Sequence, residues 1–89
     1  MIRITHIRMT SGGSRHDHID RLRWINPDTG ATGDNSRAEM VAWIEQGGTA
    51  FVTDGVNTVY VRVVNATPKY VQTYADKTPT DNLLALPRF

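Results

Sequence analysis

The chain has 89 residues, of which 39% are apolar and 21% are charged, and its formal net charge is +1. These values indicate one globular domain over residues 1–89, and the balanced charge does not by itself point to nucleic acid or a membrane surface as a partner. The absence of cysteine excludes disulfides, zinc–thiolate sites, iron–sulfur clusters and cysteine nucleophiles.

The first third of the chain predicts two strands. Residues 2–9 predict a strand in which the apolar phase changes near Thr5, and this change indicates a β-bulge. Residues 19–25 predict a second strand, in which apolar residues alternate with arginines. Residues 26–30, with the sequence Asn-Pro-Asp-Thr-Gly, predict a turn, and we expect residues 29–35 to continue it as a polar loop.

A helix is predicted at residues 37–46. Ser36 and Glu39 have the spacing of a capping box, in which the serine hydroxyl and the glutamate carboxylate bond reciprocally to backbone N–H groups. Three large apolar residues follow at helical spacing, which predicts an amphipathic helix. Residues 47–48, both glycine, predict its end because glycine readily adopts the left-handed conformation.

Three further strands are predicted after the helix. They comprise residues 49–53, 58–64 and 69–75, and Asp54-Gly55 predicts a hairpin between the first two. We interpret residues 78–89 as a docking tail in which Asp81 caps a short helical turn.

Together these elements predict an α+β fold in the order β-β-α-β-β-β. The most economical packing places one helix on one face of a small, mostly antiparallel sheet. We expect four large side chains in its core: Trp24, Met40, Trp43 and Phe51. A secreted domain of this size usually carries disulfides, and no segment has the roughly 18 apolar residues of a membrane span, so we expect a cytoplasmic domain without membrane contact.

The sequence resembles a family of short bacterial and phage proteins of unknown function, DUF3892. The resemblance rests on the opening residues 2–8, the strand that ends at Trp24, the helix followed by two glycines, and residues 70–76. Its most specific part is the ending Asp-Asn-Leu-Leu-Ala-Leu-Pro at residues 81–87. The resemblance implies a small domain of bacterial or phage origin, and it implies no activity, cofactor or site.

An arginine-bearing sheet face is the first candidate site. Arg21 and Arg23 share one face of their strand, and Tyr60 and Arg62 share a face of another. Arginine binds phosphate bidentately and nucleic-acid bases stack on aromatic rings, so these four residues could bind nucleic acid or a nucleotide. Arg3 or Arg8 from the neighbouring strand could join the same face. The alternative is an ordinary solvent-facing pair of strands with cross-strand charges.

Two further candidates are local. If residues 16–20 are extended, His16, His18 and Asp20 point the same way and could bind a divalent metal, although a solvated loop explains the same residues and is favoured. The glycines of loop 27–36 could present backbone N–H groups to an anion at the start of the helix, but the P-loop ending is absent. We expect no bound cofactor.

The leucines of the tail form a candidate partner surface. Leu83, Leu84 and Leu86 either close the core or cover a neighbouring subunit. Catalysis is the weakest hypothesis: no nucleophile motif is recognisable, and a small chain has little room for a deep pocket. An acid–base pair is conceivable only between His16 or His18 and Asp17 or Asp20. The sequence therefore favours a non-enzymatic protein-binding module, with another protein or a second copy as the partner, and nucleic-acid binding is the alternative.

Overall fold

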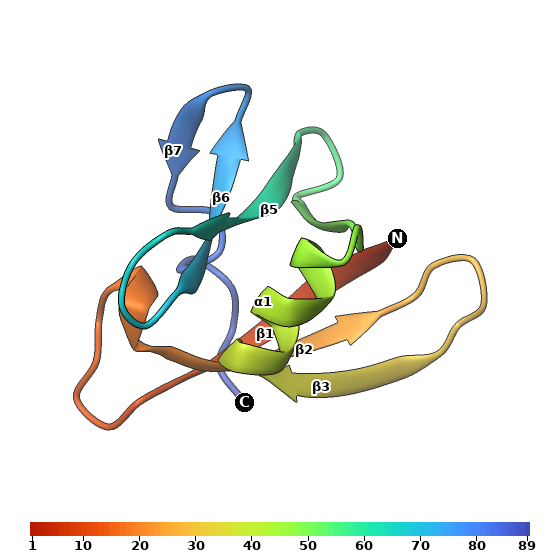
Figure 1. The fold of residues 1–89 in the computed structure, drawn as a ribbon. Coiled ribbons are helices and arrows are strands. Elements are labelled where there is room, and N and C mark those ends of the chain that lie inside the picture. Colours follow the sequence, from red (N-terminus) through yellow and green to blue (C-terminus); the bar gives the residue numbers. More distant parts are fainter.

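The fold is a seven-stranded sheet with one α-helix, seen in a computed structural model that describes residues 1–89 (Figure 1). Its elements are β1 (Ile2–Met9), the 3-10 helix η1 (His16–His18), β2 (Ile19–Ile25), β3 (Thr32–Ser36), α1 (Arg37–Glu45), β4 (Ala50–Thr53), β5 (Thr58–Val64), β6 (Tyr70–Ala75) and β7 (Thr78–Thr80). The strand order is β3-β2-β1-β4-β5-β6-β7, and only the β1–β4 pair is parallel. The predicted α+β class and mostly antiparallel sheet are confirmed.

A bulge divides the central strand β1 into two parts. Ile4 pairs with Trp24 and His6 pairs with Arg23, so Thr5 has no partner of its own on β2. The extra residue shifts the alternation of side chains, and for this reason Ile4 and Ile7 are both buried although three positions separate them. This confirms the phase change that the sequence shows near Thr5.

The capping box fixes the start of α1. The Ser36 hydroxyl accepts a hydrogen bond from the Glu39 N–H at 3.2 Å, and the Ser36 N–H donates to Glu39 Oε1 at 3.0 Å. Gly47 has a φ of 102°, which is the left-handed region predicted for the end of the helix. The predicted helix 37–46 is thus confirmed to within one residue of its observed end.

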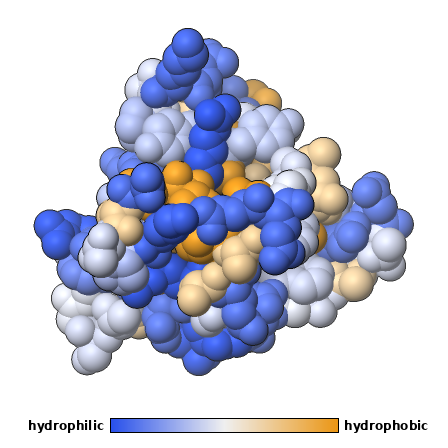
Figure 2. Space-filling model, viewed as in Figure 1, coloured by the Kyte–Doolittle hydropathy of each residue, from blue (hydrophilic) through white to orange (hydrophobic).

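The helix packs on what we call the inner face of the sheet. It contacts strands on both sides of the sheet centre, β2 and β3 as well as β5 and β6, and it buries Met40 and Val41. The β2–β3 and β6–β7 hairpins extend in different directions, which shows how strongly the sheet twists (Figure 1). In the view that shows α1, apolar side chains gather at the centre and polar ones surround them (Figure 2).

The tail packs on its own domain. Leu83 is fully buried in the core, and its N–H donates to the Thr73 hydroxyl at 3.3 Å. Leu84 and Leu86 are partly buried against the same core. Beyond them, the Ile7 N–H donates to the Pro87 carbonyl, and the Phe89 N–H donates to the Ile7 carbonyl. The tail therefore joins the edge of β1 in the part that β4 does not reach.

Three sequence-based predictions need correction. The expected loop 29–35 is wrong beyond residue 31, because residues 32–36 form β3, which pairs along β2. Residues 78–80 of the tail form the short strand β7. Phe51 is not a core residue, because it alternates with the buried Ala50 and Val52 and therefore projects to the opposite, outer face. Met40 is in the core as predicted, and Trp24 and Trp43 are packed at its border.

No helix of the fold has the length and apolar character needed to cross a membrane. The longest, α1, has nine residues.

Truncation of Leu83 tests how much the tail stabilises the domain. We expect Leu83→Ala to lower the free energy of unfolding by about 2–5 kcal/mol, because the side chain is fully buried and the variant leaves a cavity. Val56→Ala is the control, since Val56 is 88% exposed and its truncation should change stability by less than about 0.5 kcal/mol. Urea unfolding measures both, and equal stabilities for the two variants would contradict a structural role for the tail.

The carboxylate of the capping box should make helix stability depend on pH. The hydrogen bonds from Ser36 and Asn35 hold the pKa of Glu39 below its ordinary value of 4.5. Because the pKa is lowered by folding, the stabilisation is complete above the ordinary pKa of 4.5 and is lost as the pH falls through the lower pKa of the folded state. Glu39→Gln keeps the hydrogen-bonding geometry but does not titrate. Thermal unfolding should therefore show a smaller loss of stability on acidification for the variant, and parallel pH profiles would contradict this account.

Candidate binding face of the sheet

A row of aromatic side chains crosses the outer face of the sheet. Phe51 on β4 lies opposite Tyr60 on β5, and Tyr60 lies opposite Tyr74 on β6. Side chains of directly opposed residues have Cβ atoms about 4.5–5.5 Å apart. The three rings therefore form one aromatic row, by which we mean Phe51, Tyr60 and Tyr74.

Two arginines lie close to the aromatic row, one at its end and one beside it. Arg3 on β1 is the register partner of Phe51 and thus extends the row by one strand. Arg62 follows Tyr60 on the same face of β5 and lies opposite Gln72. Both guanidinium groups are on exposed residues, and none of the three ion pairs of the structure includes them. Tyr60 is also accessible, with 47% of the surface of the residue exposed.

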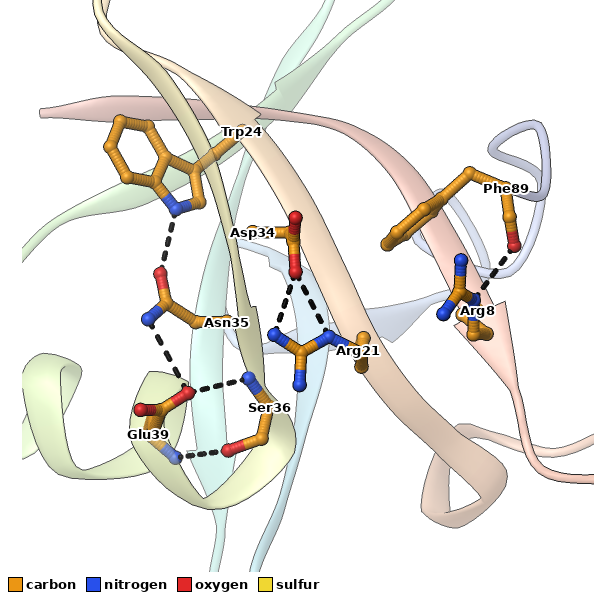
Figure 3. A network of polar contacts seen from close by, with 8 residues as sticks. All are labelled: Arg8, Arg21, Trp24, Asp34, Asn35, Ser36, Glu39 and Phe89. Carbon is orange, nitrogen blue, oxygen red and sulfur yellow. Dashed lines mark hydrogen bonds and ion pairs between the residues drawn. The ribbon is translucent and has the colours of Figure 1, made fainter.

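A second group of arginines lies on the same outer face over β1 and β2, but these arginines interact with acidic and aromatic side chains of the domain itself. Arg21 donates from Nε and Nη2 to Asp34 Oδ1 at 2.9 and 2.6 Å (Figure 3). The hydrogen bond to Asp34 raises the pKa of Arg21, which keeps the guanidinium charged. Arg21 is therefore largely paired within the domain.

Phe89 engages two more of these arginines. The guanidinium carbons of Arg8 and Arg23 lie 4.5 and 4.2 Å from the centre of its ring, which is cation–π geometry. His6 meets the same ring edge-on at 6.4 Å between centroids. Arg8 Nε also donates to the Phe89 backbone oxygen at 2.9 Å (Figure 3). This arrangement fixes the end of the tail on the outer face.

The four residues predicted to form one site thus lie on one face but in two groups. Arg21 and Arg23 belong to β2, whereas Tyr60 and Arg62 belong to β5, and β1 and β4 separate them. A depression of about 540 Å³ lies over β1, β2 and β3, next to the first group, and Arg23 and His6 line it. The β5 group has free side chains beside the aromatic row and is the more accessible half of the predicted site.

The histidine segment does not have the extended conformation that the metal hypothesis required. His16 and His18 lie in η1, and His18 Nδ1 accepts hydrogen bonds from the backbone N–H groups of Ser14 and Arg15. Asp20 lies in β2, and no group of three or more acidic or histidine side chains is placed to hold a metal ion. Burial lowers the pKa of His16, and its Nε2 atom is buried without a hydrogen-bond partner.

The predicted anion cradle at the start of α1 is already occupied. The backbone N–H of Ser36 donates to the Glu39 carboxylate, and that of Glu39 donates to the Ser36 hydroxyl. The carboxylate also places negative charge where an anion would bind. This end of the helix is therefore closed to anions.

Sequence reasoning found Tyr60 and Arg62 and considered Arg3, but it did not include the other two rings of the aromatic row, Phe51 and Tyr74. One signal was available, because the hairpin at Asp54-Gly55 fixes the register that sets Phe51 opposite Tyr60. The positions of Arg3 and Tyr74 depend on the parallel β1–β4 pair and on the β5–β6 register, which no local motif specifies.

Comparison with known proteins gives one match. No curated protein and no solved structure matches the chain. The family described as protein of unknown function (DUF3892) matches residues 3–87, which is nearly the full length of the chain. The chain therefore belongs to the DUF3892 family, as its resemblance in sequence implies.

Proposed function

We propose that this DUF3892 protein is a non-enzymatic binding module of bacterial or phage origin that holds single-stranded nucleic acid on the outer face of its sheet. The observation that supports the proposal is the aromatic row, with Arg3 and Arg62 free beside it. Aromatic rings on a sheet face offer stacking surfaces to unpaired bases, and every base has a face that can stack.

The dimensions of the face suit a short single strand. Adjacent strands are about 4.8 Å apart, so the path from Arg3 across Phe51 and Tyr60 to Tyr74 covers about 14 Å. That span accommodates a few unstacked bases, with the arginines positioned for phosphates. Since the net charge is only +1, stacking rather than charge must supply much of the affinity.

A protein partner or a second copy of the chain stays a prediction that rests on the small size of the domain. The leucine tail gives it no support, because Leu83 is fully buried in its own core. Leu84 and Leu86 are also partly covered by that core. The outer face has accessible aromatic rings and two arginines without an ion pair, whereas the leucines of the tail are covered. For this reason we favour nucleic acid as the partner.

Substitutions at Tyr60 test the stacking interaction. Tyr60→Phe keeps a ring and should bind a fluorescent single-stranded oligonucleotide as the unmodified protein does. Tyr60→Leu removes the π-face and should weaken binding by about 1–3 kcal/mol. Fluorescence anisotropy measures both variants, with single-stranded RNA and DNA of the same mixed sequence as probes. Absence of binding at low salt, or equal affinities for the leucine and phenylalanine variants, would contradict the proposal.

The salt dependence of binding tests the two free arginines. If Arg3 and Arg62 each contact one phosphate, the slope of log K against log salt concentration should be about −1.4 for a single strand. Arg62→Ala should reduce the magnitude of this slope to about 0.7. Arg15→Ala is the matched control, because the exposed Arg15 lies next to η1, pairs only with Asp17 and should leave the slope unchanged. A slope that does not respond to Arg62→Ala would assign the phosphate contacts to other residues.

A further inference from the structure

A pocket of about 330 Å³ lies on the inner side of the fold, between α1, the start of β1 and the β2–β3 hairpin. Both tryptophans of the chain, Trp24 and Trp43, line it, together with the apolar side chains of Ile2 and Met40. Its volume is at the lower end of the range for ligand pockets, which suits a small organic molecule or a single side chain.

Two glycines provide room for the tryptophan rings. A Cβ atom at Gly48 would lie 2.3 Å from the Trp43 ring, and one at Gly33 would lie 2.8 Å from the Trp24 ring. Real Cβ atoms do not approach this closely, so each indole packs directly against backbone. The indole of Trp24 is also fixed by its Nε1–H, which donates to Asn35 Oδ1 at 2.8 Å (Figure 3).

One carboxylate lines the pocket with an oxygen left free. Glu39 Oε1 accepts hydrogen bonds from the Ser36 N–H and from Asn35 Nδ2. No hydrogen bond reaches Oε2, and none of the three ion pairs includes Glu39. The lowered pKa of this group keeps it ionised at neutral pH. Asn35 bonds to both Trp24 and Glu39, and thereby holds a ring and a negative charge in one wall (Figure 3).

We propose that this pocket binds an alkylated ammonium group between Trp24, Trp43 and the free oxygen of Glu39. Indole rings attract cations through the negative charge of their faces, and tryptophan is the best of the aromatic residues for this interaction. The carboxylate supplies the opposite charge, and Ile2 and Met40 supply apolar surface for the alkyl groups. The charge of Glu39 attracts a cation, repels an anion and contributes little to the binding of a neutral ligand, so charge complementarity favours a cation.

The same ammonium chemistry occurs in free quaternary amines and in methylated lysine side chains. Choline and a short peptide with trimethyllysine are therefore both used as probes, and a preference for one of them identifies the source. The neutral compound 3,3-dimethyl-1-butanol has the shape of choline without its charge and is the matched control ligand.

The test is a titration that follows tryptophan fluorescence in the full chain, because both tryptophans of the protein line the pocket. We expect choline or the peptide to change the emission in a saturable way, and the neutral compound to bind about tenfold more weakly. Glu39→Gln keeps the capping-box acceptor and should weaken binding of the cation about tenfold, while Glu45→Gln is the control on the same helix. Glu45 pairs with Lys69 and does not line the pocket.

Circular dichroism of both variants verifies that the helix is intact. Equal affinity for choline and its neutral counterpart, an unchanged affinity in Glu39→Gln, or no saturable response to either cation would each overturn the proposal. These outcomes are independent of oligonucleotide binding on the outer face, because the pocket and the aromatic row lie on opposite sides of the sheet.

Discussion

The pairing of β1 along both of its edges is the constraint on which the rest of the structure depends. One edge pairs with β2 along most of its length, and the other pairs first with β4, at Ile2 and Arg3, and then with the tail at Arg88. A single helix of nine residues cannot cover a seven-stranded sheet. The bulge at Thr5 changes the phase of β1 so that its second half also directs an isoleucine, Ile7, into the core. The tail that pairs beside Ile7 adds the cover that the helix lacks, because it buries Leu83 in the same core.

The parts of the fold that local chemistry specifies were predictable from the sequence. The capping box, the terminal glycines of the helix and the Asp54-Gly55 hairpin each act over a few residues, and the structure has all three. The two missed strands, β3 and β7, are the edges of the sheet. Their sequences, Thr-Gly-Asp-Asn-Ser and Thr-Pro-Thr, are polar and poor in strand-forming residues, as edges that avoid aggregation often are. Only pairing with β2 and β6 makes them strands.

The candidate face shows why residue type alone is a poor guide to a site. Arg21 and Arg23 were predicted to bind a ligand because they share one face of a strand. In the structure, Arg21 pairs with Asp34 and Arg23 packs over the ring of Phe89. Arg3 was expected beside those two arginines, but its register with Phe51 places it at the end of the aromatic row. Phe51 was expected in the core because large aromatics usually lie there. Its position was decided instead by the alternation of β4, in which Ala50 and Val52 take the inner face.

The pairing of Arg21 with Asp34 also explains why the Glu39 carboxylate in the inner pocket has no ion-pair partner. Arg21 is close enough to Glu39 to contribute to the lowering of that residue's pKa, but it donates its hydrogen bonds to Asp34. An arginine bound directly to Glu39 would neutralise the one carboxylate that lines the pocket together with the two tryptophans. Asp34 on β3 thus holds the cation on the outer side of the sheet, while Asn35, the next residue, points inward and fixes the carboxylate and an indole. The alternation of this one polar edge strand therefore pairs Arg21 with a carboxylate on one face and leaves the Glu39 carboxylate without an ion pair on the other.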